Sequence, residues 1–232
     1  MMRKILTTIL AAFVFANLAS AEERPVVIEL YTSQGCSSCP PADALLQELA
    51  TRDNVVALAL HVDYWDYIGW KDKFADPEHT KRQRLYASVA GRRMIYTPQM
   101  IINGQEGVVG NRPRDVNELI RKYASKESYV DLDVTRTGDS LRITAKAMDG
   151  LTGTMSIQIA RYRPKSTVDI TKGENAGRTL NYSNIVTELT EVATWDTRRP
   201  LDVKALAQGD QPIVVLVQRD GLGPIEAVQV LR

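Results

Sequence analysis

The chain has 232 residues and carries 29 lysines and arginines against 28 aspartates and glutamates, so its formal net charge is +1. This near balance, without a basic block, gives no reason to expect nucleic acid or an anionic membrane surface as a partner. The length suits one large domain or two ordinary ones, and each could bury a core without the help of a disulfide.

The first residues have the pattern of a secretory signal peptide. A basic start is followed by an apolar run over residues 5–18 and by an Ala-Ser-Ala cleavage site. The run is shorter than the about 20 apolar residues of a retained membrane helix. We therefore expect residues 1–21 to be removed, the mature chain to start at Glu22, and the protein to be periplasmic or secreted, where disulfides persist.

Apolar strands alternate with helical patterns over residues 25–124. This β-α-β-α-β-β-α order predicts an α/β unit around a central sheet. Strands are predicted at 26–31, 55–62, 100–104 and 106–110, and helices at 42–49, 77–90 and 113–124.

After Ser125 the helical periodicity disappears, and short segments of alternating polarity take its place. Turn-forming pairs of glycine and aspartate separate several of these segments. Such a pattern over about 100 residues is typical of a β-sandwich. Strands are predicted at 129–135, 140–148, 153–162, 184–192, 212–218 and 225–231.

The stretch TSQGCSSCPPAD (32–43) contains both cysteines of the sequence, Cys36 and Cys39. They follow a predicted strand and stand at the start of a predicted helix, where unpaired N–H groups and the helix dipole lower the pKa of a thiol. The second thiol is then placed to resolve a mixed disulfide. The Cys-x-x-Cys spacing, in this order of elements, predicts a redox-active pair.

Several stretches of the sequence carry a family resemblance. VVIELYTSQGCSSCPPADALLQEL (26–49), HVDYWDYIGWKD (61–72) and YTPQMIINGQEGVVG (96–110) resemble a family of exported bacterial proteins of unknown function within the thioredoxin-like superfamily. GENAGRTLNYSNIV (173–186) resembles the same family, so the resemblance covers nearly all of the mature chain.

The resemblance implies a redox pair, Cys36 and Cys39, that faces a loop with a cis-proline. Thr97 and Pro98 match that loop, so we expect a cis bond before Pro98. In thioredoxin-like proteins the residue before this proline offers its backbone to the substrate peptide, and here that residue is Thr97.

The resemblance also implies the fold of each half. The usual leading β-α unit is missing, so the α/β core is similar to the clipped core of glutaredoxin. We expect an α/β thioredoxin-like domain over residues 22–126, followed by an all-β sandwich domain over residues 127–232.

Two residues near the cysteines have an expected local role. Glu29 falls where thioredoxins carry a buried acid, so it is a candidate general base for the resolving thiol; the alternative is a carboxylate paired with a basic residue. Pro40 suits the first turn of a helix, so the helix is expected to begin there with Cys39 as its cap.

Aromatic residues gather in the stretch 61–74, after the second predicted strand. Tyr64, Trp65 and Trp70 could form an apolar groove for a substrate peptide, or they could pack a long loop onto the sheet or onto the second domain. The polar loop 169–184 could shape a partner surface through Asn175 and Arg178, or it could be a plain connection.

Other roles for the cysteine pair stay open. As a staple it would add only roughly 2 kcal/mol, because it closes a very short loop. Zinc needs about four ligands and is disfavoured, since the chain has two cysteines and two histidines. Copper is the stronger alternative, because thiolates suit Cu(I) and a cytochrome oxidase assembly branch of the thioredoxin fold adds a distant histidine, which His61 could supply.

Together these observations predict an exported thiol–disulfide oxidoreductase that acts on protein or peptide thiols and needs no bound cofactor. Cys36 and Cys39 are its expected catalytic pair. A redox partner protein is expected, because no flavin or nicotinamide motif is present. The alternatives are a copper-binding assembly factor and a non-catalytic interaction protein.

Overall fold

The computed structural model describes residues 24–232. Over this range the chain forms three α-helices, one short 3-10 helix and eleven strands, so strand outweighs helix. The predicted signal peptide, residues 1–21, lies outside the described residues. No helix of residues 24–232 is long and apolar enough to cross a membrane.

The elements of the first half follow the predicted order. Each of its three α-helices has proline in its first turn, a position that suits proline's fixed φ and missing N–H group. The elements are β1 (Val26–Thr32), α1 (Pro40–Leu49), β2 (Val55–His61), the 3-10 helix η1 (Asp66–Ile68), α2 (Pro77–Val89), β3 (Gln99–Ile102), β4 (Glu106–Val109) and α3 (Pro113–Ala124).

The second half consists of strands, two of which are much longer than predicted. β7 has 17 residues and β8 has 19, and they pair along almost their whole length as an antiparallel hairpin. Most of the predicted loop 169–184 therefore belongs to these strands. The elements are β5 (Val130–Thr137), β6 (Ser140–Ala147), β7 (Thr154–Ile170), β8 (Arg178–Asp196), β9 (Leu201–Leu206), β10 (Ile213–Arg219) and β11 (Ile225–Leu231).

The described strands form one eight-stranded sheet in the order β11-β10-β7-β8-β2-β1-β3-β4 and one three-stranded sheet in the order β5-β6-β9. The large sheet is mixed: β1 runs parallel to β2 and antiparallel to β3. Both halves of the chain contribute to it, and they meet at a bridge between Ala59 of β2 and Ile185 of β8. A hydrogen bond from the side-chain amide nitrogen Nδ2 of Asn184 to the carbonyl oxygen of Ala57 supports this junction.

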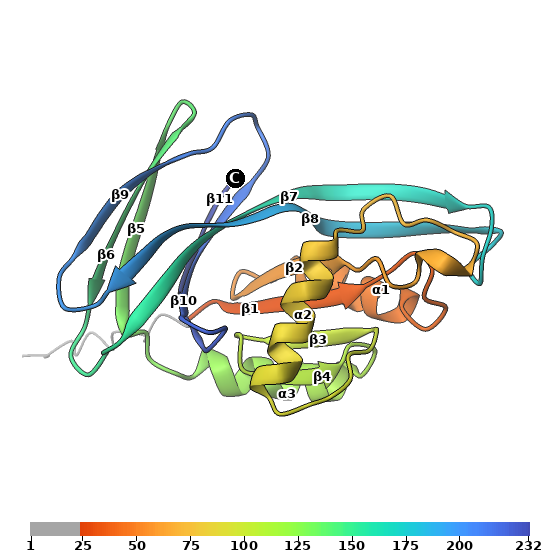
Figure 1. The fold of residues 1–232 in the computed structure, drawn as a ribbon, viewed down its shortest axis with the longest axis horizontal. Helices are drawn as coiled ribbons and strands as arrows, with labels where there is room; N and C mark the ends of the chain where they lie inside the picture. Colours follow the sequence, from red (N-terminus) through yellow and green to blue (C-terminus); the bar gives the residue numbers. More distant parts are fainter. Residues whose placement is uncertain (1–23) are drawn as a thin grey trace, which may run out of the picture.

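The predicted fold class, an α/β thioredoxin-like domain followed by a separate sandwich, is therefore wrong. The sheet of the first half continues through β8, β7 and β10 into the second half (Figure 1). Sequence periodicity identifies strands but says nothing about which strands pair across the chain, so this continuity was not visible from the sequence. Part of the predicted β-sandwich is present: the three-stranded sheet packs face to face on the β7–β10–β11 end of the large sheet.

Apolar cores lie on both faces of the large sheet. On one face, α1 and α3 cover β1, β2 and β3 around Leu30 and Leu46. On the other face, Tyr31 and Leu60 of the first half pack with Tyr162 of β7, and Tyr86 of α2 belongs to the same cluster. The second core joins the two halves directly.

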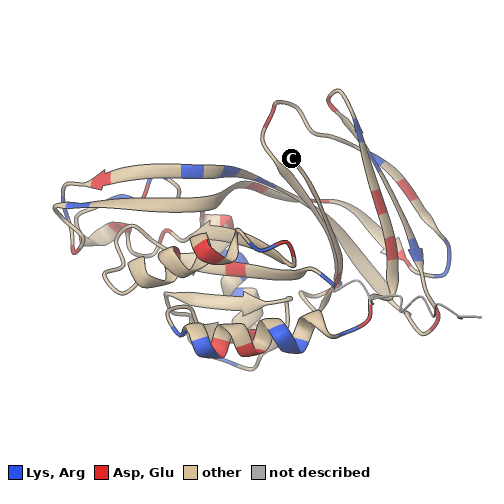
Figure 2. Ribbon diagram, turned by 180° about the vertical axis from the view of Figure 1, so that it is seen from behind, with Lys and Arg blue, Asp and Glu red and all other residues tan. Residues whose placement is uncertain are grey.

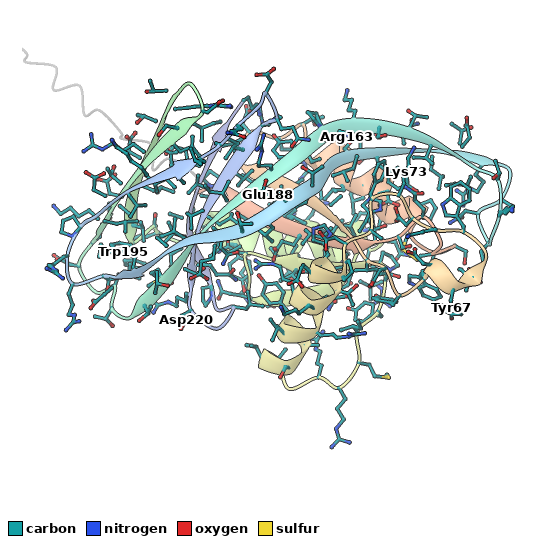
Figure 3. The ribbon with its side chains drawn as sticks, turned by 45° about the horizontal axis from the view of Figure 1, so that its top comes forward. Tyr67, Lys73, Arg163, Glu188, Trp195 and Asp220 are labelled. Carbon is teal, nitrogen blue, oxygen red and sulfur yellow. A yellow bond between two sulfur atoms is a disulfide. The ribbon has the colours of Figure 1, made fainter. Side chains whose placement is uncertain are left out.

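The paired strands β7 and β8 extend as an arm along the first half toward α1 (Figure 1). Leu180 and Tyr182 of this arm are buried, and Trp70 and Phe74 of the aromatic stretch pack against the arm's apolar cluster. Figure 3 places Tyr67, which is 80% exposed, at the end of the molecule where the arm turns. The arm thus brings a segment of the second half onto the loops that follow β1 and β2.

Basic and acidic residues both occur along α3 and along the three-stranded sheet (Figure 2). This distribution fits the near-zero net charge of the sequence.

Candidate redox site

The loop between β1 and α1 holds a disulfide between Cys36 and Cys39. The N–H group of Cys36 donates to the carbonyl oxygen of Ser33 at 3.1 Å, and that of Cys39 donates to the carbonyl oxygen of Cys36 at 3.2 Å. Cys39 is the N-cap residue, so α1 begins at Pro40 as predicted. The loop is therefore two successive turns that deliver the disulfide to the first turn of a helix.

Both cysteines are covered, whereas the residues between them are not. Cys36 is 2% exposed and Cys39 is 0% exposed, while Ser37 and Ser38 are exposed. The hydroxyl oxygen of Ser38 lies 3.4 Å from Cys36 Sγ. Access to the sulfur atoms is thus limited by the segments packed around the loop.

The peptide bond between Thr97 and Pro98 is cis, as predicted. Pro98 packs near the first turn of α1, because a Cβ atom on Gly110 would lie 3.3 Å from both Pro98 Cβ and Ala42 Cβ. The N–H group of Gly110 donates to the carbonyl oxygen of Pro98 at 3.0 Å. A side chain at position 110 would therefore force its neighbours, Pro98 and Ala42 among them, to shift.

Trp65 connects the disulfide loop to the cis-proline loop. Its indole Nε1 donates to Thr97 Oγ1 at 2.7 Å. Its backbone lies against Gly35, where an added Cβ would approach Trp65 Cβ to 3.2 Å. One side chain therefore fixes the spacing between the two loops.

The other aromatic candidates are also engaged inside the protein. Trp70 Nε1 donates to Gln34 Oε1 at 2.8 Å, and Tyr64 OH donates to Gln83 Oε1 at 3.2 Å. Burial raises the pKa of Tyr64 to about 12. The half-buried Tyr64 and Trp70 thus pack the long loop rather than line an open groove.

The turn of the β7–β8 arm rests on the disulfide loop through Asn175. Asn175 Nδ2 donates to the carbonyl oxygens of Gln34 at 2.9 Å and Cys36 at 3.0 Å. Arg178 Nη1 donates to Asn175 Oδ1 at 2.9 Å and so orients the amide. Asn175 therefore bonds the disulfide loop of its own chain directly, and Arg178 acts on that loop only through Asn175.

Glu29 lies on the face of β1 that is directed away from α1. It forms a buried ion pair with Arg82 of α2, with 2.8 Å between Arg82 Nε and Glu29 Oε1. Arg82 also donates to Gln158 and Gln218 of the second half. Of the two roles expected for Glu29, the structure has the carboxylate paired with a basic residue.

The buried acid on the side of the cysteines is Asp43, which the sequence reading did not single out. It lies one helical turn after Cys39, and its N–H group donates to the carbonyl oxygen of Cys39 at 3.1 Å. Thr32 Oγ1 donates to Asp43 Oδ1 at 2.8 Å, whereas no described residue bonds Oδ2. Burial raises the pKa of Asp43 to about 7. The signal available in the sequence was the i, i+4 spacing from Cys39.

His61 lies beneath this region in a fully buried pair with Asp72. His61 Nδ1 is 2.7 Å from Asp72 Oδ2, and that same oxygen accepts the N–H group of Gln34 at 2.8 Å. The imidazole makes edge-to-face contacts with the rings of Phe74 and Tyr182. Residues 24–232 hold no group of three His, Cys, Asp or Glu side chains arranged to bind a metal, so the copper ligand set proposed with His61 is not assembled there.

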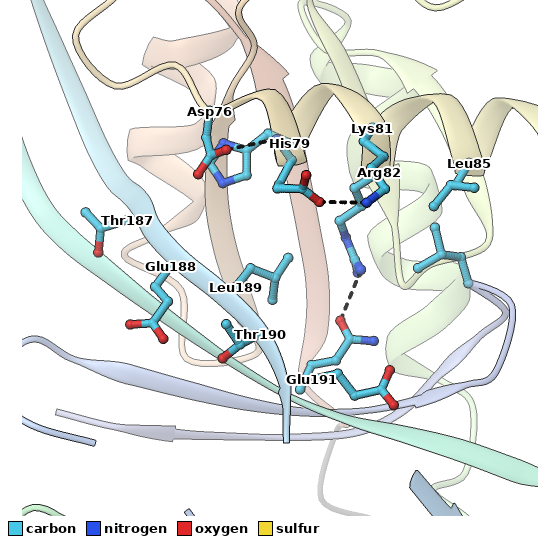
Figure 4. Close-up of a pocket in the computed structure, with 13 residues that line it drawn as sticks. Asp76, His79, Lys81, Arg82, Leu85, Thr187, Glu188, Leu189, Thr190 and Glu191 are labelled. Atoms are coloured by element: carbon cyan, nitrogen blue, oxygen red, sulfur yellow. Dashed lines mark hydrogen bonds and ion pairs between the residues drawn. The ribbon is translucent and has the colours of Figure 1, made fainter. Parts of the chain in front are cut away.

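Two grooves flank these elements. A small one of about 220 Å³ lies between α1 and the start of β8, and Asp43 and Arg178 are among its lining residues. A larger one of about 560 Å³ lies between α2 and β8, and Arg82 and Glu188 are among its lining residues (Figure 4). Only the small groove reaches a residue adjacent to the disulfide.

Comparison with known proteins identifies the family. Residues 27–218 match the family described as "Protein of unknown function (DUF1223)", so the chain belongs to that family, as the resemblance to a family of unknown function predicted. The structure is similar to the X-ray crystal structure of protein AGR_C_4864 from Agrobacterium tumefaciens, with a TM-score of 0.77 and 32% identity over 91% of this chain and 96% of that chain.

A second solved structure shares the fold at low identity. HBP35 of Porphyromonas gingivalis has a TM-score of 0.63 and 11% identity, and the match covers 90% of this chain and 75% of that chain. The comparison with curated proteins gave no match.

Proposed function

We propose that this protein is an exported thiol–disulfide oxidoreductase that exchanges disulfides with protein or peptide thiols through Cys36 and Cys39. The observation that carries the proposal is the disulfide at the first turn of α1, in a loop that Trp65 links to Thr97, the residue before the cis bond. A helix N-terminus stabilises a thiolate through its free N–H groups and its dipole. A structural staple would need neither this position nor the neighbouring cis-proline loop.

The exchange proceeds through a mixed disulfide. A substrate thiolate attacks Cys36 Sγ, the bond between Cys36 and Cys39 breaks, and Cys39 leaves as a thiolate that takes up a proton. A second substrate thiolate then attacks the substrate sulfur bound to Cys36, which releases an oxidised substrate and the Cys36 thiolate. Two electrons pass from substrate to protein, and the reverse sequence oxidises the protein again with a partner disulfide.

Asp43 is the group we assign to the proton of Cys39. It follows Cys39 by one turn, its Oδ2 is bonded by no residue within 24–232, and its pKa of about 7 suits a group that both gives and takes a proton near neutral pH. Glu29 is unsuited to this role because its carboxylate is held by Arg82.

The exported location rests on the signal-peptide pattern of residues 1–21. Expression in a bacterial host followed by fractionation and mass measurement tests it directly. A periplasmic or secreted product that starts at Glu22 is the expected result, and an uncleaved cytoplasmic product would contradict it.

The main test measures the cysteines of the purified mature protein. Equilibration with glutathione gives the reduction potential, and alkylation of the reduced protein against pH gives the pKa of the Cys36 thiol. We expect reversible exchange and a lowered thiol pKa, both lost in Cys36→Ser and kept in Ser37→Ala, an exposed neighbour on the same loop. A disulfide that is inert to glutathione would refute the proposal and favour a non-catalytic interaction protein.

A second test separates the two cysteines. The reduced protein is mixed with an aromatic disulfide that releases a coloured thiolate, first when Cys36 attacks and again when Cys39 resolves the mixed disulfide. Asp43→Asn should slow the second phase by about 100-fold at neutral pH and leave the first phase nearly unchanged. Glu48→Gln removes an exposed carboxylate from the same helix and is the control.

A further inference from the structure

The turn that joins β7 and β8, residues 171–177, contacts the disulfide loop. The two segments lie far apart in the sequence: Asn175 of the turn and Gln34 of the loop, which are hydrogen-bonded, are 141 residues apart. Within this turn Asn175 is 1% exposed, whereas the other residues are exposed or half-buried. The turn therefore holds the loop chiefly through one side chain.

Both the nitrogen and the oxygen of the Asn175 side-chain amide form hydrogen bonds. Its amide nitrogen donates to the carbonyl oxygens of Gln34 and Cys36, at 2.9 and 3.0 Å, and its amide oxygen accepts from Arg178. The Cys36 carbonyl oxygen that accepts from Asn175 also accepts from the N–H group of Cys39. The hydrogen bonds of Asn175, which we call the Asn175 clasp, therefore act on the turn that contains the disulfide.

A second contact of the same turn also places it against the surroundings of the disulfide loop. Gly173 has φ of +76° and lies so close to the aromatic stretch that an added Cβ would be 3.1 Å from Trp70 Cβ and 3.3 Å from the carbonyl oxygen of Ile68. Trp70 in turn donates to Gln34. The turn thus closes over the loop from the arm side while Trp65 and Ile68 pack on Gly35.

The turn has hydrogen bonds of its own that do not depend on Asn175's amide. They run from Ala176 N to Gly173 O and from Gly177 N to Ile170 O, and neither involves the disulfide loop. Gly177 has φ of +80°, so a left-handed glycine stands on each side of Asn175. Release of the Asn175 amide would break its two bonds to the disulfide loop and leave these bonds of the turn in place.

An extended peptide can replace this clasp. A peptide backbone presents N–H donors of the same kind as the Asn175 amide, and the two carbonyl oxygens it would bond belong to Cys36 and to Gln34, two residues before it. A small thiol without an amide group, such as 2-mercaptoethanol, has no N–H donor to offer, and it meets a disulfide whose two cysteines are 2% and 0% exposed.

We propose that Asn175 is a specificity-determining residue: its amide closes the redox loop against small thiols, and an extended peptide that carries thiols displaces it. The inference rests on the proposed exchange at Cys36. It adds the substrate class, an extended peptide segment, and assigns a role to the arm of the second half.

The test compares two reductants on the oxidised protein: 2-mercaptoethanol, which has no amide group, and a synthetic extended peptide with two cysteines. The rate of disulfide reduction is followed by quenched alkylation. Asn175→Ala should speed reduction by 2-mercaptoethanol about 10-fold, since two hydrogen bonds are lost. Reduction by the peptide should change less than about threefold, because the peptide supplies its own donors.

The control is Asn181→Ala, which removes an exposed amide of the same arm that bonds Thr167. It should leave both rates unchanged. Hydrogen exchange of residues 171–177 in Asn175→Ala checks that only the turn has loosened and that the strands of the arm stay protected.

The outcomes are distinguishable from those of the proposed function. Equal acceleration of reduction by both reductants, or no acceleration of reduction by 2-mercaptoethanol, would overturn the role of Asn175 while leaving exchange intact. A disulfide that neither reductant attacks, in the wild type or in Asn175→Ala, would instead overturn the exchange itself.

Discussion

The buried carboxyl of Asp43 makes the stability of the oxidised protein depend on pH in a way that one substitution removes. Burial raises the pKa of Asp43 from 3.8 to about 7. The folded state therefore holds this proton more tightly than the unfolded state, and the free energy of unfolding falls as the pH rises from about 4 to about 7. At about 1.36 kcal/mol for each pKa unit, the loss amounts to about 4 kcal/mol.

Asp43→Asn keeps the shape of the side chain and an oxygen that can accept from Thr32. Asparagine cannot ionise, so the free energy of unfolding of the variant does not fall with pH on account of this residue. We expect Asp43→Asn and the wild type to have similar free energies of unfolding near pH 4, and the variant to be more stable by up to about 4 kcal/mol at pH 8.

Urea unfolding of the oxidised proteins at several pH values measures this difference. Other titrating groups cancel in it: burial lowers the pKa of His79, for example, and that group is the same in both proteins. Glu48→Gln, an exposed acid on the same helix, should give a difference that is flat with pH. A flat difference for Asp43→Asn as well would refute the raised pKa and, with it, the proton role assigned to this residue.

Two further substitutions test the surroundings of the site. Glu29→Gln leaves the Arg82 guanidinium without its buried partner and should lower the free energy of unfolding by about 3–5 kcal/mol in urea, while the Cys39 phase of the coloured-thiolate assay keeps its pH profile. Trp65→Phe removes the indole bond to Thr97 and should cost about 1 kcal/mol of stability while slowing exchange with the dithiol peptide, and an unchanged exchange rate would count against the link between the two loops.

Much of the local structure was predictable, because its signals are local. The apolar runs of β1 and β2, the prolines in the first turn of each helix and the Cys-x-x-Cys pair at the start of α1 are read from neighbouring residues. The cis bond before Pro98 followed from the family resemblance rather than from spacing.

The arm of β7 and β8 was not predictable in the same way. Its outer part alternates polar residues such as Thr167 and Asn181, which bond to each other across the two strands. Without the partner strand in view, the stretch 169–184 has the composition of a loop. Its strand character depends on a pairing that only the folded chain supplies.

The positions of the acids show a related limit. Alternation along β1 tells that Glu29 and Leu30 face opposite sides of the sheet, but it does not tell which side α1 covers. The structure puts α1 on the side of Leu30, so Glu29 meets Arg82 of α2 and Asp43 remains near Cys39. The acid had to be found from the packing of the helices.

The disulfide loop depends on the second half of the chain for its packing. On the face of the sheet opposite α1, side chains of β1 and β2 share one apolar cluster with side chains of β7 and β10, as Leu58 and Leu216 do. The loop itself is held by Asn175, which the same strands deliver across the molecule. The arm and the disulfide loop are therefore joined by hydrogen bonds, at the bridge between β8 and β2 and at the Asn175 amide.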